Sequence, residues 1–385
     1  MNSSWVIKLI TLGSLCFHVL YLNAQDPLFS QYHISKAYQN PALTGSDGTI
    51  TLSTLVREQW GAIDRFKQFP GAFSTQFASA EFAESQLKNA FGLFFLRDVE
   101  GDGLLETQMF GLNYAYVLPF ETKHQLHNIR MGLGFFYNEK SIDWNKLLFS
   151  DQLDPRGPEF FAAQSLHAQY FDQFSVSNPK WIEVNPGIVY RYNQKGYRGA
   201  GAQFELGASF SHLITLATRS HVESLQGLAT ESHDKIVVHG TAFFPRLQLG
   251  TKKRKFTPLP AFRYEYQHQI NTLTVGSRFM FMNLGTSIFY QNTVSDRIAL
   301  STDAIIIGCD MSWAVAKGQI IELGVSYDLN INGLNANSGG TMEVSVKYQY
   351  LSNSRRGRVV CPSVNKAHTD RYENIWHKTI HRKHM

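Results

Sequence analysis

The sequence predicts an all-β protein, a transmembrane antiparallel β-barrel of about 14 strands that is preceded by a signal peptide. Three observations predict this fold. Apolar and polar residues alternate in many segments, turn-forming loops separate these segments, and the first residues have the pattern of an export signal. A period of two places successive side chains on opposite faces of a strand, so each such strand has one apolar and one polar face.

The clearest hairpin lies near the C-terminus. Odd-numbered residues from Ile321 to Leu329 are apolar or aromatic, and the even-numbered residues between them are small or polar. In 342–350 the even-numbered positions are apolar or aromatic, and the loop 331–340 is rich in Asn and Gly. Such loops reverse the chain. We therefore expect an antiparallel hairpin whose apolar face touches either a second sheet or lipid.

Residues 1–24 indicate export. Lys8 precedes an apolar stretch at 9–22, and Ala24 is the expected cleavage residue, which is typical of a signal peptide. Cys16 would suit a lipid anchor, but the bulky Leu15 before it argues against one. After residue 24 no segment approaches the roughly 20 continuous apolar residues that a helical span needs. A membrane location therefore requires a closed barrel, in which every backbone group is paired.

The alternating segments follow one another at short intervals. We expect strands at 49–60, 71–82, 89–98, 106–118, 128–138, 181–192, 201–212, 237–249, 260–268, 272–282, 285–291, 298–311, 320–330 and 341–351. Most are close to the roughly 9–11 residues that a tilted membrane strand needs. Their even number agrees with bacterial single-chain barrels.

The apolar faces distinguish lipid from a second sheet only weakly, because a secreted β-sandwich adhesin would show the same alternation. Strands such as the one with Phe262, Tyr264 and Tyr266 gather aromatic side chains on one face. After the leader only Cys309 and Cys361 remain, too few for a disulfide framework. A chain with so many hairpins and no such framework closes into a barrel more easily than it packs as one sandwich. We therefore favour the outer membrane of a Gram-negative bacterium, with its lipid around the barrel.

The chain divides into four regions. These are a signal peptide at 1–24, an irregular N-terminal segment at 25–47, the barrel at 48–351 and a tail at 352–385. The tail has eight Lys or Arg residues against two Asp or Glu residues, a net charge of +6, whereas the whole chain is +5. The longest stretch without a strand pattern is 141–179. Long loops without structure of their own are usually functional.

The polar faces of the strands should point into the barrel. They carry charges of both signs, which indicates a salt-bridged or plugged interior rather than a wide pore. The residues expected to face the lumen are Glu205, Arg263, Glu265, Arg278, Glu322, Asp328, Glu343 and Lys347.

No pattern in the chain points to catalysis. Nucleophile-elbow, zinc-protease and phosphate-loop motifs are absent from the sequence. Asp98, Glu100 and Asp102 resemble the start of a calcium loop, but Met109 stands where the bidentate Glu would be. His377, His381 and His384 lie in the basic tail. We expect no enzyme activity, no cofactor and no metal. Because the protein is expected to be exported, we also expect no nucleic-acid partner.

Several short motifs form a recognisable set. The start of the mature chain reads Gln25 to Tyr32 (QDPLFSQY), followed by Asn40-Pro41-Ala42 and by a strand with Arg57, Gln59 and Trp60. Further motifs are Ala115-Tyr116 before Pro119, Ile142-Asp143-Trp144, Phe149-Ser150-Asp151-Gln152, the hairpin with Tyr327, Asp328 and Glu343, and Cys361-Pro362. Over 25–362 this set resembles the PorP/SprF family of type IX secretion system membrane proteins from Bacteroidetes.

The resemblance implies an outer-membrane barrel, not an enzyme, that serves secretion, surface attachment of large adhesins or gliding motility. Its implied partners are type IX secretion components and a large secreted protein with a C-terminal sorting domain. The candidate contact residues are Asp26, Phe29, Gln31, Tyr32, Asn40 and Pro41, which alternatively plug the lumen or tie the chain start to the wall. The runner-up function is an outer-membrane channel or lipid-uptake porin. The tail extends beyond the family's usual end near the Cys-Pro pair.

Overall fold

The computed structural model describes most of the chain between residues 26 and 350. The described ranges are 26–47, 50–60, 73–84, 88–101, 105–122, 125–142, 179–196, 199–215, 234–244, 256–267, 270–281, 283–295, 301–316, 318–331 and 339–350. The predicted signal peptide, positions 143–178 of the predicted long loop, the basic tail and Cys361 lie outside these ranges.

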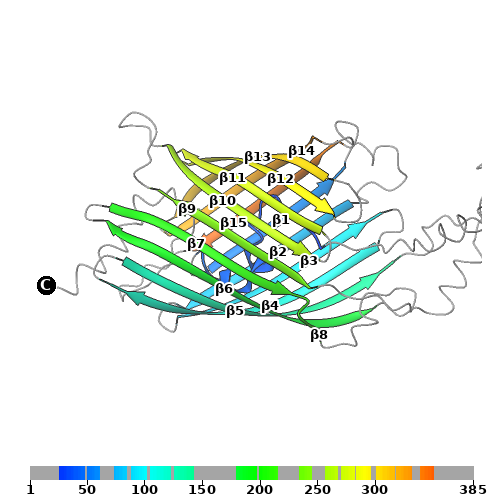
Figure 1. Cartoon of the computed structure of the whole chain (residues 1–385), viewed down its shortest axis with the longest axis horizontal. Coiled ribbons are helices and arrows are strands. Elements are labelled where there is room, and N and C mark those ends of the chain that lie inside the picture. Colours follow the sequence, from blue (N-terminus) through cyan, green and yellow to red (C-terminus); the bar gives the residue numbers. More distant parts are fainter. Residues whose placement is uncertain are drawn as a thin grey trace, which may run out of the picture.

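The described strands form one antiparallel sheet that closes on itself (Figure 1). The strands are β1 (Ile50–Gln59), β2 (Phe73–Glu84), β3 (Asn89–Glu100), β4 (Leu105–Glu121), β5 (Gln125–Ser141), β6 (Lys180–Gly196), β7 (Gly199–Ser211), β8 (Ile214–Thr215), β9 (Lys235–Phe243), β10 (Phe256–Gln267), β11 (Ile270–Phe281), β12 (Leu284–Ser295), β13 (Ser301–Ala316), β14 (Gln319–Asn330) and β15 (Thr341–Tyr350).

Strands that follow each other in the chain pair with each other except at β8, where β7 pairs with β9 instead, and β1 pairs with β15 to close the ring. The short β8 pairs with β6, as β7 does, and continues β7 beyond an interruption at His212, whose φ is +62°. Because β8 continues β7, the fifteen strands of the described chain form a barrel wall that is fourteen strands around. The predicted fold class, a transmembrane antiparallel barrel of about 14 strands, is confirmed, and a two-sheet sandwich is not what these residues form.

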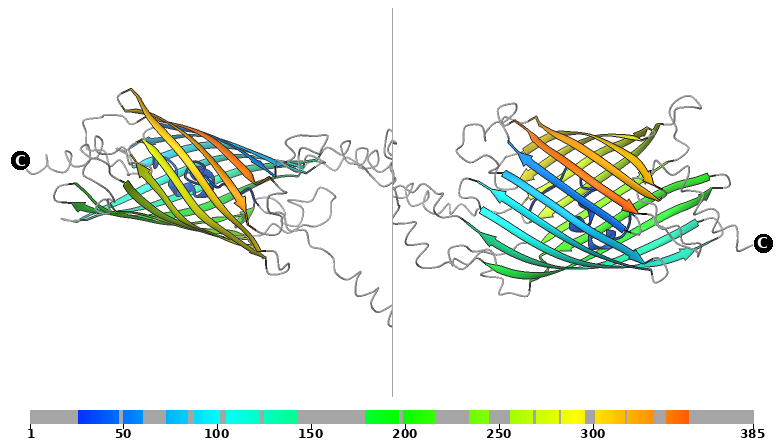
Figure 2. Two further views of the ribbon diagram at one scale, coloured as in Figure 1. Left: turned by 90° about the horizontal axis from the view of Figure 1, so that it is seen from above. Right: turned by 180° about the vertical axis from the view of Figure 1, so that it is seen from behind.

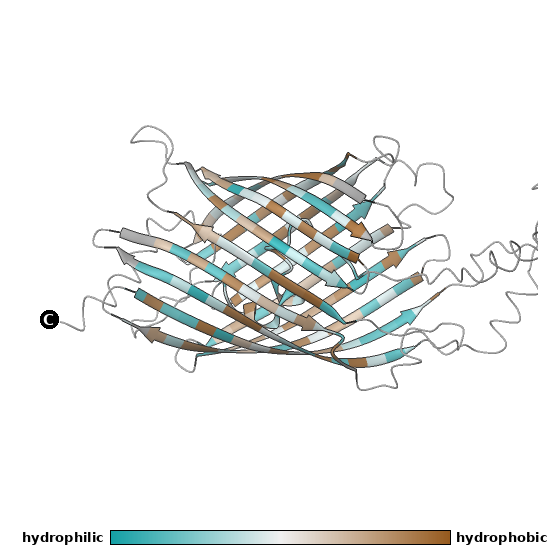
Figure 3. Ribbon diagram, viewed as in Figure 1, coloured by the Kyte–Doolittle hydropathy of each residue, from teal (hydrophilic) through white to brown (hydrophobic). Residues whose placement is uncertain are grey.

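Hydrophilic and hydrophobic residues alternate along the strands (Figure 3), and the two faces of the wall differ accordingly. In β14, for example, Leu323, Val325 and Tyr327 are exposed on the outside, whereas Glu322 and Asp328 are buried inside. Leaving a row of large apolar side chains exposed is costly in water but favourable in hydrocarbon. The outward face therefore suits the lipid of a membrane.

The two ends of the barrel have connections of different length. At one end, here called the long-loop end, the strands are joined by residues 60–72, 101–104, 142–179, 216–234, 268–269, 296–300 and 331–340. At the other, the short-turn end, the connections are 85–88, 122–124, 197–198, 244–255, 282–283 and 317–318. The first residue of β1 and the last residue of β15 both lie at the short-turn end, as the register of their pairing requires.

Residues 26–47, here called the luminal segment, lie inside the ring of strands (Figure 2). The segment contains the one-turn helix α2 (Lys36–Gln39) and the 3₁₀ turn η1 (Pro41–Leu43). Pro41 fits the start of η1 because its fixed φ suits a first helical position. Among the described residues, no helix is both long and apolar enough to cross a membrane.

Candidate functional site

The candidate site is the contact between the luminal segment and the inner wall, and its first part surrounds Asp26. The Asp26 carboxylate lies 3.0 Å from Nε2 of His212 and 3.2 Å from Nζ of Lys235. The backbone N–H of Asp26 donates to Oε1 of Gln267 at 3.3 Å. Burial by itself would raise the pKa of Asp26, but the charges of Lys235 and His212 outweigh it and hold that pKa far below its usual range. The carboxylate is therefore ionised and paired.

A second contact joins Ser30 and Gln31 to the hairpin of β14 and β15. The backbone N–H groups of both residues donate to the two carboxylate oxygens of Glu343, at 2.7 and 2.8 Å. Arg57 of β1 donates to the same carboxylate at 2.6 Å and to the Ser30 hydroxyl at 2.9 Å. Since Glu343 is completely buried, its charge requires these partners. The cluster fixes the segment to three strands at once.

Apolar packing holds the middle of the segment. Phe29 packs against Phe77 and Tyr38, with ring centroids 5.8 and 5.9 Å apart, and Tyr38 packs against Phe94 at 6.1 Å. The full cluster of buried side chains is Phe29, Ile34, Ala37, Tyr38, Leu55, Phe77, Phe94, Leu96, Met109 and Phe136. Strands β1 to β5 therefore have apolar side chains on the inward face too, where the segment covers them.

Asn40 and Pro41 approach the wall more closely than any side chain there would allow. The Asn40 side chain accepts the Ala42 N–H at 2.9 Å and donates to the Ala208 carbonyl at 3.1 Å. A Cβ added at Gly187 would lie 2.1 Å from Oδ1 of Asn40, and one added at Gly132 would lie 2.1 Å from the Ala42 nitrogen. Glycine is thus required at both wall positions while the segment is in place.

The end of the segment is held by charges near the short-turn end. Arg130 of β5 is buried and donates to the carbonyl oxygens of Ala42 and Thr44. Lys36 pairs with Asp47, and Nζ of Lys347 lies 3.6 Å from the same carboxylate. Burial would raise the pKa of Asp47, but Lys36 and Lys347 hold it well below its usual range.

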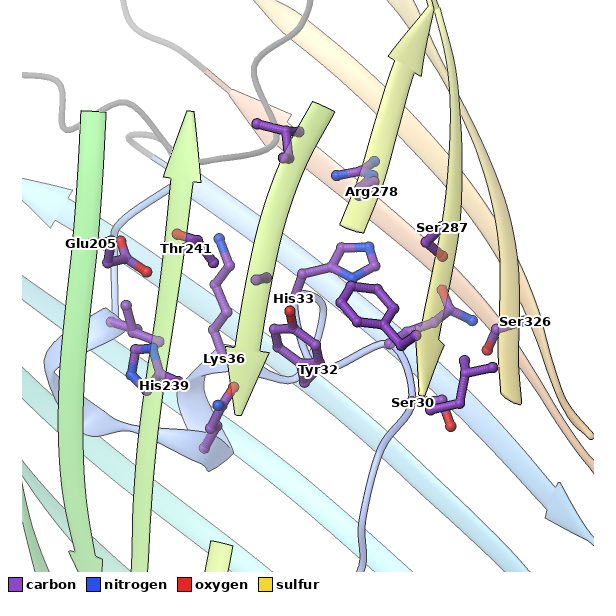
Figure 4. Close-up of a pocket in the computed structure, with 17 residues that line it drawn as sticks. Ser30, Tyr32, His33, Lys36, Glu205, His239, Thr241, Arg278, Ser287 and Ser326 are labelled. Carbon is purple, nitrogen blue, oxygen red and sulfur yellow. The ribbon is translucent and has the colours of Figure 1, made fainter. Parts of the chain in front are cut away.

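Beside α2 the segment leaves a cavity of about 60 Å³ (Figure 4). Tyr32 and His33 form part of its lining and point toward β10 and β11, with Arg278, Lys36 and Glu205 nearby. The Tyr32 ring also packs against Phe289 at 5.8 Å and against the Arg263 guanidinium at 5.9 Å. The lining is mainly apolar, with Leu259, Phe289 and Ile306 beside a few polar groups, and a space of this size is not a passage.

The eight charges expected to face the lumen all point inward and have partners of opposite charge. Arg263 pairs with Glu265, and Arg278 pairs with Asp310 and Glu322. Lys347 lies 3.2 Å from Glu322, Glu205 pairs with Arg191, and Arg57 joins Asp328 to Glu343. Further inward charges that the sequence reasoning did not name are Arg57, Glu81, Arg130, Glu183, Arg191, Lys235 and Asp310. Extending the alternation along every strand would have indicated them.

One group of possible metal ligands occurs in the described part of the chain, formed by His33, Asp310 and Glu322. Arg278 donates to both carboxylates, at 2.9 Å to Asp310 and 2.9 Å to Glu322. The charge that a cation would have to neutralise is already neutralised by the guanidinium. The group is therefore a salt-bridge cluster that borders the luminal segment.

Of the six predicted contact residues, all touch the inner wall. Asp26 lies in the His212 and Lys235 cluster, Phe29 in the apolar cluster and Gln31 on Glu343. Tyr32 lines the cavity, and Asn40 and Pro41 face the wall glycines. Chemically, this arrangement of buried ion pairs and backbone acceptors holds a peptide segment in place.

Comparisons with known proteins agree with this architecture. The model of a family described as type IX secretion system membrane protein PorP/SprF matches residues 22–348. No curated protein sequence matches the chain.

Several solved structures are similar at low sequence identity. The β domain of the Bordetella autotransporter BrkA is 10% identical, with 80% of this chain and 100% of that chain covered and a TM-score of 0.35. A Pseudomonas aeruginosa FadL homologue is 9% identical, with 82% and 94% covered and a TM-score of 0.36. BamA from Haemophilus ducreyi lacking POTRA domains 1–3 is 8% identical, with 78% and 70% covered and a TM-score of 0.37.

Proposed function

The chain belongs to the PorP/SprF family of type IX secretion system membrane proteins, and from this premise we propose that it acts by binding other proteins rather than by catalysis or conduction. The protein is an outer-membrane β-barrel. Its role is to support the secretion or surface attachment of a large protein with a C-terminal sorting domain, together with other components of the secretion system. Gliding adhesins are one such class of cargo.

The observation that carries this proposal is the filled lumen. The luminal segment is fixed to the wall at Asp26, at Ser30 and Gln31, at Asn40 and at the carbonyls bound by Arg130. A barrel whose interior is occupied by its own chain offers its loops and outer faces to partners, not a bore to solutes. Loops on a rigid scaffold are where proteins commonly bind one another.

The runner-up function, a channel or lipid-uptake porin, requires a continuous path through the barrel. The cavity of about 60 Å³ beside Tyr32 is far smaller than the lumen of a water-filled porin. The structure therefore favours the binding role.

The proposal is tested by deleting the chain from its host and measuring proteins on the cell surface and in the medium by quantitative mass spectrometry. We expect one or more large proteins with a C-terminal sorting domain to be lost from the surface or the medium and to return when the wild-type chain is restored. Unrelated outer-membrane proteins serve as the control and should not change. If no protein with a sorting domain changes in amount or location, the proposed role is wrong.

Conduction is measured separately with the purified barrel in planar bilayers. The wild-type protein should show no steady open-pore current. A steady current from the wild-type barrel would favour the channel function instead.

A further inference from the structure

We propose that the processed N-terminus of this protein emerges at the extracellular mouth of the barrel, although both ends of the barrel-forming chain lie on the periplasmic side. The inference goes beyond the proposed function, because it depends on the direction in which the luminal segment runs through the lumen. The N-terminus would then be part of the extracellular surface, which the alternating strand pattern does not predict.

The first step is the position of Asp26. Its carboxylate is held by Lys235, the first residue of β9, and by His212, which directly follows β7. Its N–H donates to Gln267, the last residue of β10. These three positions all lie at the long-loop end of the barrel. Since consecutive Cα atoms are only about 3.8 Å apart, the chain enters the lumen from that end.

The second step is the position of the other end of the segment. The carbonyls of Ala42 and Thr44 accept from Arg130, in the first half of β5, and the Gly45 N–H donates to Glu81, near the end of β2. Both wall residues lie toward the short-turn end, where β1 begins at Ile50. The segment thus runs through the lumen from the long-loop end toward the short-turn end.

The third step is the orientation of the barrel in the membrane. Outer-membrane barrels have short periplasmic turns and longer extracellular loops. The connections 142–179 and 216–234 belong to the same end as Asp26, and the turns 197–198, 282–283 and 317–318 belong to the opposite end. Asp26 is therefore at the extracellular mouth, and the new amino terminus that follows leader removal lies beside the long loops.

The inference is tested by labelling cysteine on intact cells with a membrane-impermeant maleimide. A Cys-Gly-Ser insertion is placed between Gln25 and Asp26, in a chain with Cys309→Ser and Cys361→Ser. Glu100→Cys, exposed at the long-loop end of β3, and Asn283→Cys, exposed in a short turn, are the controls on the two sides. Heat-modifiable migration in a denaturing gel checks that each variant folds as a barrel.

We expect the inserted cysteine to react on intact cells to within about twofold of Glu100→Cys, while Asn283→Cys reacts only after lysis. Reaction of the inserted cysteine only after lysis would place the N-terminus in the periplasm and overturn the inference. Reaction only after denaturation would place it inside the lumen, which also overturns it. The outcome is independent of the secretion assay, so the two proposals can fail separately.

Discussion

Glu343 is the single residue on which the luminal segment depends most directly. Its two oxygens accept two successive backbone N–H groups of the segment, and its charge is neutralised by Arg57. Without this carboxylate, Arg57 would keep only Asp328 as a charged partner, at 3.3 Å, and two buried N–H groups would lose a charged acceptor. Contacts of this kind are worth more than the exposed ion pairs at the strand ends, such as Lys180 with Glu139.

We expect Glu343→Gln to destabilise the docked state of the segment by about 2 kcal/mol, roughly a 30-fold rise in the released population. The measurement is the rate at which trypsin cleaves after Lys36 in the purified barrel, followed by mass spectrometry, since this rate reports the released state. Glu58→Gln, on the outward face of β1, is the matched control and should leave the rate unchanged. Equal rates in the two variants would contradict the role assigned to Glu343.

His33 makes the docking sensitive to pH. Burial lowers the pKa of His33 well below its usual range, and the charges of Arg278, Lys347 and Lys36 lower it further, against the opposing effect of Glu322. In the released segment His33 would have an ordinary pKa near 6.5. Because the released state binds the proton more readily, docking is unaffected above that pH and weakens as the pH falls below it.

We therefore expect cleavage after Lys36 to accelerate between pH 7 and pH 5.5, by up to about tenfold per pH unit. Asp26 and Asp47 stay ionised over this range, because their pKa values are held far lower. His33→Gln should reduce the acceleration while Glu343→Gln retains it; His239 and Glu81 also contact the segment, so a smaller pH dependence should remain. An unchanged pH dependence in His33→Gln would contradict the role of His33.

At the scale of elements, glycines of the wall allow the luminal segment to pack closely against it. Gly132 of β5 and Gly187 of β6 face each other in the register and both lie against η1. In a strand, glycine often marks the close approach of another backbone. Two neighbouring strands thus provide a groove for Asn40 to Ala42.

We expect Gly132→Ala to displace the segment and leave the barrel folded, at a cost of about 1–3 kcal/mol for overpacking. Gly308→Ala is the matched control, because its Cβ would meet the Ser287 hydroxyl, a small side chain that can rotate. Protease release measures the effect on the segment, and heat-modifiable migration measures the barrel. If both variants release the segment equally, the contact with η1 is not what requires the glycine.

Substitution of the aromatic residues of the luminal segment distinguishes its two possible roles, attachment to the inner wall and contact with a partner protein. Phe29→Ala would lose its contacts with Phe77 and Tyr38, at a cost of about 3–5 kcal/mol. We expect release of the segment to increase in Phe29→Ala, and less so in Tyr32→Ala, while cargo still reaches the surface. Loss of cargo delivery with the segment still docked would instead indicate that these residues contact a partner.

Much of the wall could be predicted from the sequence, because the period of two is a local property. It indicates the inward phase of Glu322, Asp328 and Glu343 directly. Strand ends were less predictable. The strand expected at 237–249 ends at Phe243 in the structure, two residues before Pro245, which cannot donate to a ladder. The strand predicted at 298–311 is β13 (Ser301–Ala316), which continues past residue 311 through an irregularity at Ala314, where an apolar run interrupts the alternation.

The docking of the segment could not be predicted in the same way. Glu343 lies more than 300 residues from Ser30 in the chain, and no local pattern connects them. The Asn40-Pro41-Ala42 motif indicates a turn, but not that glycines of β5 and β6 receive it. Contacts of this kind depend on the closed shape of the barrel, which brings every strand within reach of one segment.

At the scale of the whole molecule, the barrel is a closed wall around charges that are paired with nearby wall residues or with the luminal segment. The described inward side chains include more carboxylates than cations. The carboxylates are Glu81, Asp98, Glu183, Glu205, Glu265, Asp310, Glu322, Asp328 and Glu343, and the cations are Arg57, Arg130, Arg191, Lys235, Arg263, Arg278 and Lys347. The segment covers this lining, so its removal should expose a polar passage with a small excess of negative charge.

We therefore expect deletion of residues 26–47 to convert a closed barrel into a conducting one that prefers cations. The measurement is the current through single barrels in planar bilayers, with the reversal potential read under a gradient of potassium chloride. A lining with excess negative charge attracts cations, and this preference should fade at high salt, where charges are screened within about 3 Å at 1 M. Lys347→Gln in the deletion variant should strengthen the preference, because it removes one of the inward cations. A folded deletion variant that stays closed would show that something other than the luminal segment fills the barrel.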